Sequence, residues 1–132
     1  MNTIEQNLFT IAREEKGSHW NSLIESINDH CIRLAVNENE TYSWHRHPNS
    51  DEVFLVLEGK LVLEFENDEK KELMSGDFFR VPANTTHRTI AVERTVNLCF
   101  EKRNIETVFL EASFFKSAGH AATKSHMEKP KT

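Results

Sequence analysis

The residues with the most chemistry in this sequence are His45, His47 and Glu52, which lie within eight positions of one another. His45 and His47 are two residues apart, so on a β-strand both side chains project from the same face. Two imidazoles side by side on a face that also carries core residues are costly unless something satisfies them, and a metal ion accepts both nitrogens. Glu52 precedes the uncharged run VFLVL, and a carboxylate that begins a buried strand likewise requires a cation. The sequence therefore predicts that these side chains bind one metal ion.

A third histidine completes the predicted ligand set. Pro82 ends the run GDFFRV, and His87 lies five residues later at the start of the next expected strand. Three neutral imidazoles and one carboxylate suit Fe(II), Mn(II), Ni(II), Cu(II) or Zn(II). Four protein ligands around an octahedral ion leave two positions for water, substrate or dioxygen, and this opening distinguishes a working site from a closed structural one. The predicted cofactor is one divalent transition metal, with Fe(II) or Mn(II) favoured and Ni(II) or Zn(II) as alternatives.

Short strands must position these ligands. From Trp20 onward the chain consists of brief apolar or alternating runs, among them HCIRLAV, EVFLVLEG, KLVLEFE and TVNLCFE, separated by polar turns such as Pro48-Asn49-Ser50-Asp51 and Asn67-Asp68. Many short strands at regular spacing indicate an antiparallel sandwich or barrel. The fold class predicted from this pattern is all-β.

One helix is expected, at the N-terminus. Ile4, Leu8 and Ile11 recur at helical spacing, Asn2 or Thr3 can cap the start, and Gly17 stands where a helix would end. We therefore expect an N-terminal helix over residues 1–17 and a barrel domain over residues 18–115. Residues 116–132 are expected to form a flexible basic tail, because they are rich in Ala, Ser, Thr and Lys and have no periodic apolar face.

Two segments of the chain resemble the motifs of the cupin superfamily. HRHPNSDEVFLVLEG resembles the first cupin motif, with gaps of four and six residues between its histidine pair, glutamate and glycine. GDFFRVPANTTH resembles the second motif. The resemblance implies a small jelly-roll (double-stranded β-helix) barrel of the bacterial single-domain type. It also carries over His45, His47, Glu52 and His87 as the metal ligands.

Three positions depart from the family pattern. Asn39 and Asn84 stand where the family usually has glycine. Asparagine is the non-glycine residue best able to adopt a left-handed backbone, so both turns should form. Ala91 replaces the asparagine that often closes the second motif. Since this position is not a metal ligand, we expect coordination to be unaffected. The other histidines lie outside both motifs and are expected not to be ligands: His19, His30, His120 and His126.

A substrate pocket is expected beside the metal. Its candidate lining residues, which depend on strand register, are Arg80, Phe54, Phe65 and Cys99. An inward Arg80 would hold a substrate carboxylate or phosphate with two hydrogen bonds, whereas the alternative is an outward Arg80 on a solvated face. Glu52 is the candidate catalytic base, because a carboxylate that briefly leaves a metal can accept a proton.

The leading functional hypothesis is a metal-dependent enzyme that acts on a small oxygen-bearing molecule. Cupins include dioxygenases and sugar-phosphate isomerases, and three histidines with one glutamate suit redox-active iron, which favours a dioxygenase-like reaction. The first alternative is a non-catalytic cupin that binds or senses a small ligand. The second is a scaffold that docks a partner through its N-terminal helix.

Composition limits the partners and the compartment. The net charge is −5, and residues 1–115 carry −8, which argues against binding to nucleic acid. The N-terminus lacks the features of a signal peptide, and no apolar run is long enough to cross a membrane, so we expect a cytoplasmic protein. Cys31 and Cys99 are expected to be buried free thiols, with a disulfide as the alternative. The apolar end segments FTIA and VFLEASFF would suit a covered sheet edge, which favours a homodimer.

Overall fold

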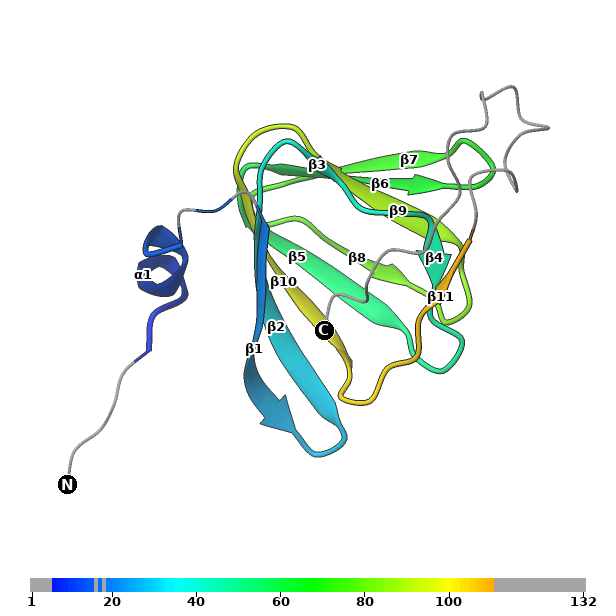
Figure 1. The fold of residues 1–132 in the computed structure, drawn as a ribbon, viewed down its shortest axis with the longest axis horizontal. Helices are drawn as coiled ribbons and strands as arrows, with labels where there is room; N and C mark the ends of the chain where they lie inside the picture. The colour runs from blue at the N-terminus through cyan, green and yellow to red at the C-terminus, as the bar shows by residue number, and fades with distance from the viewer. Residues whose placement is uncertain (1–5, 16, 18, 111–132) are drawn as a thin grey trace.

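A computed structural model describes residues 6–15, 17 and 19–110, and Figure 1 shows two sheets that face each other. The five-stranded sheet has the order β1 (His19–Ile27), β2 (His30–Asn37), β10 (Thr95–Lys102), β5 (Glu52–Glu58) and β8 (Phe78–Val81). The six-stranded sheet has the order β11 (Val108–Phe109), β4 (His45–Arg46), β9 (His87–Ala91), β6 (Lys60–Phe65) and β7 (Lys70–Met74), and β3 (Glu40–Thr41) pairs with β9. The pairing is antiparallel throughout. The predicted all-β jelly-roll barrel is confirmed.

The core lies in two places because the strands alternate. Between the sheets is a cluster that includes Phe54, Val56 and Leu63. The alternate side chains of the five-stranded sheet form a second cluster, which includes Leu34 and Val36 and is completed by Ala12 of the helix. Side chains on a strand alternate between its two faces, so the same strands supply both clusters.

The N-terminal helix is present but shorter than predicted. Helix α1 spans Leu8–Arg13, and its cap is Asn7, whose side-chain oxygen accepts hydrogen bonds from the backbone N–H groups of Phe9 and Thr10. An asparagine at this position stabilises a helix start, which explains why the helix begins after residue 7. The expected caps at residues 2 and 3 lie outside the described residues. Arg94 holds the helix to the barrel by donating to the carbonyl oxygens of Ala12 and Glu15.

The turns around the ligand strands use left-handed backbone. Asn39 and Asn84 have φ angles of 54° and 67°, which confirms that asparagine replaces glycine in both turns. Gly59, which joins β5 to β6, has φ of 85°. A Cβ atom at this position would collide with the carbonyl oxygen of Arg94 and lie 2.9 Å from Cα of Thr95. The glycine of the first motif is therefore required by close backbone packing.

The two cysteines are buried and unbridged, as predicted. Burial, followed by the charge of Glu101, raises the pKa of Cys31 above its ordinary value, so this thiol stays protonated. Within the described part of the chain, no helix has the length and apolar character needed to span a bilayer.

Candidate metal centre

The four predicted ligands come together inside the barrel. His45 lies on β4 and His47 follows it, Glu52 begins β5, and His87 begins β9, directly opposite His45 in the strand register. Their exposed fractions are between 0% and 5%. One potential ligand atom from each side chain lies within 4.8 Å of those of the other three. Strand ends from both sheets therefore deliver one compact donor set.

Hydrogen bonds fix which imidazole nitrogen faces the centre. Nδ1 of His45 lies 2.7 Å from the carbonyl oxygen of Ser43, and Nδ1 of His87 lies 2.8 Å from that of Thr85. Nδ1 of His47 lies 2.9 Å from the carbonyl oxygen of Glu106. A carbonyl oxygen can only accept, so each Nδ1 carries the proton and each neutral ring keeps a lone pair on Nε2.

Burial keeps the ring of His45 neutral. Burial, reinforced by the neighbouring His87, lowers the pKa of His45 well below its usual value. A neutral imidazole is the form that binds a metal, because protonation removes the lone pair. His45 is therefore held in its ligand form.

The donor set fits a cation. Oε1 of Glu52 lies 3.3 Å from Nε2 of His47 and 3.4 Å from Nε2 of His87. Nε2 of His45 and Nε2 of His87 are buried and make no hydrogen bond. Three nitrogen lone pairs and a carboxylate directed at one another repel unless a positive charge lies among them. Imidazole with carboxylate is the donor set of a first-row divalent metal.

Three of the four predicted pocket residues lie near the ligands. Sγ of Cys99 lies 2.8 Å from Oε2 of Glu52, and the ring of Phe54 is 6.2 Å from that of His87. The ring of Phe65 is 6.4 Å from that of His87. These three side chains lie beside the candidate ligands, and their role in a substrate pocket stays a prediction.

Arg80 does not join the centre. It pairs in register with Val53, whereas its neighbour Phe79 pairs with the buried Phe54. Its side chain is 61% exposed and forms an ion pair with Asp51 at 3.1 Å. Of the two orientations left open by the sequence, the structure has the outward one, so Arg80 is removed from the set of pocket residues.

The arginine that enters the barrel is Arg33, which the sequence reasoning missed. Its side chain is 12% exposed, and Nε lies 3.3 Å from Oε2 of the buried Glu101. One feature of the sequence could have indicated an inward Arg33: Cys31, Arg33 and Ala35 alternate with the apolar residues of HCIRLAV. It places these three residues on one face of β2 but does not show which face lies inside the barrel.

The non-ligand histidines are accounted for where the structure describes them. His19 contacts Glu40, and His30 contacts Asp29, both away from the centre. These two contacts agree with the prediction that neither histidine is a ligand. His120, His126 and the whole expected tail over residues 116–132 lie outside the described residues, so those expectations stay predictions.

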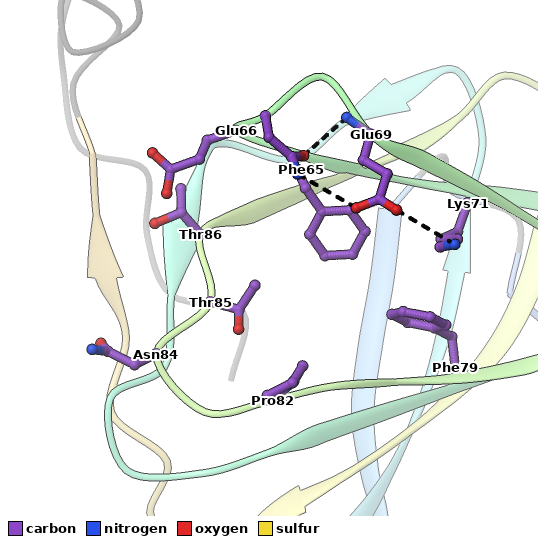
Figure 2. A pocket seen from close by; sticks show the side chains of 10 residues that line it. Phe65, Glu66, Glu69, Lys71, Phe79, Pro82, Asn84, Thr85 and Thr86 are labelled. Carbon is purple, nitrogen blue, oxygen red and sulfur yellow. Dashed lines mark hydrogen bonds and ion pairs between the residues drawn. The ribbon is translucent and has the colours of Figure 1, made fainter.

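A pocket of about 500 Å³ opens beside the centre. Figure 2 shows it between the turn after β6 and the loop after β8, with the side chains of Phe65, Phe79, Pro82 and Thr85 around its middle. The rings of Phe65 and Phe79 are 6.0 Å apart. Lys71 lies at its edge, 5.8 Å above the ring of Phe79 and 3.7 Å from Glu69. Phe65 lines the pocket, and its ring also lies 6.4 Å from that of His87, so this side chain links the pocket with the centre.

A small antiparallel barrel with an internal site of three histidines and one glutamate defines the class of this protein. Residues 32–100 match the model of the cupin domain family, and the chain belongs to that family.

Relatives agree with this assignment. The chain is 50% identical over 106 residues to the uncharacterized protein YdbB of Bacillus subtilis, which covers 80% of this chain and 93% of that protein. A cupin-2 domain protein from Shewanella frigidimarina has a similar structure, with a TM-score of 0.69, 28% identity and coverage of 74% of this chain and 94% of that one. A putative mannose-6-phosphate isomerase from Ralstonia eutropha shares the fold, with a TM-score of 0.65, 22% identity and coverage of 76% and 98%.

Proposed function

We propose that this cupin is a metal-dependent enzyme acting on a small oxygen-bearing molecule, with a dioxygenase-like reaction favoured over an isomerase-like one. The observation that carries the proposal is the convergence of three imidazoles and a carboxylate within 4.8 Å in a buried site. His45, His47, Glu52 and His87 would hold one divalent ion, with Fe(II) or Mn(II) favoured and Ni(II) or Zn(II) as alternatives. The ion would polarise a substrate oxygen or bring dioxygen beside a chelated substrate.

The protein's own groups orient the site and exclude water. The Nδ1–H bonds to backbone carbonyls hold the three rings at fixed angles, and such outer contacts set ligand orientation and basicity. Phe54 and Phe65 form apolar walls beside His87. Glu52 is the proposed base, which would leave the ion briefly and accept a substrate proton.

The pocket behind Phe65 supports a small-molecule substrate. Its volume and its mixture of aromatic and hydroxyl side chains are those of a site for a compact organic ligand. Its polar rim includes Thr85 and Thr86, directly before His87 in the chain. A ligand bound there would lie next to the strand end that presents a metal ligand.

A metal analysis combined with a substrate screen tests the proposal. Purified protein should contain close to one transition-metal ion per chain. Small acids and diketones should be screened with an oxygen electrode, and sugar phosphates should be followed by NMR without oxygen. Oxygen uptake that requires both metal and substrate supports the dioxygenase, whereas oxygen-independent isomer formation supports the isomerase. Protein that holds no metal and binds none when Fe, Mn, Ni or Zn is added would overturn the proposal.

The lining of the pocket favours a second candidate function. None of the four candidate ligands is among the residues that line it, so a ligand could bind there without reaching the metal. Such a cupin would bind or sense a small molecule and not transform it. Tight ligand binding that leaves the spectrum of bound Co(II) unchanged, with no turnover, would identify this case.

We also propose that the protein is a cytoplasmic homodimer that binds neither nucleic acid nor membranes. The buried free thiols of Cys31 and Cys99 are compatible with a reducing compartment. Phe78, on the edge strand β8, is 72% exposed and would be covered by a second copy. Light scattering should give twice the chain mass, and Phe78→Glu should halve it. A monomeric wild-type protein would contradict the dimer.

A further inference from the structure

The two carboxylate oxygens of Glu52 have different neighbours. Oε1 faces Nε2 of His47 and of His87 at 3.3 Å and 3.4 Å. Oε2 accepts a hydrogen bond from Sγ of Cys99 at 2.8 Å. Both side chains are only 1% exposed, so this bond lies in a water-poor environment where hydrogen bonds are strong.

Sheet register brings the thiol to this oxygen. Cys99 on β10 pairs with Phe54 on β5, and Glu52 stands two residues before Phe54 on the same face. Cys99 and Glu52 are therefore diagonal neighbours across an antiparallel pair, a separation that side chains can bridge. The contact depends on backbone pairing, which holds both side chains in place.

A second buried carboxylate lies on the other side of the thiol. The ligand atoms of Glu52, Cys99 and Glu101 are within 4.8 Å of one another. Nε of Arg33 lies 3.3 Å from Oε2 of Glu101 and supplies a positive charge there. This guanidinium disfavours a second metal ion at the cluster and balances Glu101. The thiol hydrogen is directed to Glu52.

We propose that Cys99 is a positioning residue of the metal centre. Its S–H holds Oε2 of Glu52, so that Oε1 is the carboxylate atom presented to the ion. A carboxylate held in this way binds through one oxygen and leaves the remaining positions of the ion to substrate or dioxygen. This inference rests on the proposed metal site and adds to it the group that orients its only acidic ligand.

Replacement of Cys99 with the metal affinity as readout tests this role. Co(II) serves as the probe, its dissociation constant is measured by competition with a chelator, and its visible spectrum reports the donor set. Cys99→Val fills the space of the thiol without the donor, and loss of such an outer partner should weaken binding roughly 10- to 100-fold. Cys99→Ser restores a donor and should bind Co(II) more tightly than the valine variant. The spectrum of the valine variant should shift as Glu52 changes its mode of binding.

Cys31→Val is the matched control. Cys31 is equally buried and lies beside Glu101 in register, but it is not part of the cluster of Glu52, Cys99 and Glu101. It should leave both the Co(II) affinity and the spectrum unchanged, so a general effect of losing a buried thiol would appear in both variants.

Three outcomes overturn the inference. Equal Co(II) affinity and an identical spectrum for Cys99→Val would show that the thiol does not position Glu52. A sulfur-to-cobalt charge-transfer band in the wild type would make Cys99 a ligand. A loss of affinity in Cys31→Val as large as in Cys99→Val would reduce the effect to core packing. If His47→Ala also binds Co(II) like the wild type, the metal site itself is wrong, which separates that failure from failure of the Cys99 role.

Discussion

The two faces of the five-stranded sheet are built from the same strands and differ in chemistry. Beside the apolar cluster with Phe54 and Val56, the inner face carries the buried carboxylates of Glu52 and Glu101 and the buried thiol of Cys99. The outer face carries an aliphatic cluster that α1 covers, and Leu34 and Val36 within it are fully buried. Alternation along β5, β10 and β2 thus places the carboxylates and the thiol on the inner face and the cluster covered by α1 on the outer face.

The difference shows which face contributes favourable free energy to folding and which face contributes unfavourable free energy. Burying an aliphatic side chain contributes roughly 1.5–3 kcal/mol, which favours folding on the outer face. Burying imidazoles and carboxylates among one another costs free energy unless a cation compensates. The outer face therefore stabilises the strand register that the inner face needs, and a metal ion bound at the proposed site would offset the cost of the inner face.

Loss of a candidate ligand that lies opposite the inner face should remove the metal and leave the fold. His47→Ala deletes one of four convergent donors, so the purified variant should hold little metal by elemental analysis. Chelator should lower the melting temperature of the wild type, since the ion binds only the folded arrangement, by an amount equivalent to roughly 2.7 kcal/mol at a metal concentration one hundred times the dissociation constant. The variant should not respond to chelator. An unfolded variant would contradict the separation of the two faces.

Loss of an outer-face residue should do the opposite. Leu34→Ala opens a cavity under α1 and should lower the free energy of unfolding by about 2–5 kcal/mol, measured by urea denaturation of metal-free protein. At temperatures where the variant is folded, its metal stoichiometry should equal that of the wild type. Loss of metal from the folded variant would show that the two faces are coupled.

A smaller change should detach the helix from the outer face. Nη2 of Arg94 donates to the carbonyl oxygens of Ala12 and Glu15 at 2.6 Å and 3.0 Å. Hydrogen bonds from a charged donor contribute about 1.5–3 kcal/mol, so Arg94→Ala should destabilise the protein by roughly that amount. Hydrogen exchange should increase in residues 8–13 and remain slow in β5 and β9. Uniform exchange across the barrel would contradict a local attachment.

The smallest effect concerns a charged pair that does not face the metal centre. Partial burial raises the pKa of Glu64, but Arg88 at 2.6 Å and Lys70 at 3.3 Å outweigh it and bring this pKa below its usual 4.5. A depressed folded-state pKa adds stability above the unfolded pKa, and that stability is lost as pH falls through the folded value. Melting temperatures of wild type and Glu64→Gln should therefore differ at pH 7 and converge toward pH 3. A constant difference over that range would contradict the assignment.

The local sequence determined the ligand set and the strand pattern. The spacing of His45 and His47 fixes their shared face, since side chains on a strand repeat every two residues. The turn asparagines and the buried free thiols also followed from residue type. Two of the three carbonyl oxygens that accept from the histidine rings are also close in sequence. Ser43 and Thr85 each stand two residues before the histidine that they orient.

Tertiary structure decided everything that depends on which face is inside and which strand lies alongside. Side chains on a strand alternate in direction, so the sequence shows that Arg33 and Leu34 point to opposite sides, but only packing shows that Arg33 points inward. Register with Val53 turned Arg80 outward, and register between β10 and β5 placed Cys99 against Glu52. The third carbonyl oxygen that accepts from a histidine ring belongs to Glu106, which is 59 residues from His47 in the sequence. Contacts of this kind come from strand pairing over long separations, and a periodic sequence pattern carries no information about the partner strand.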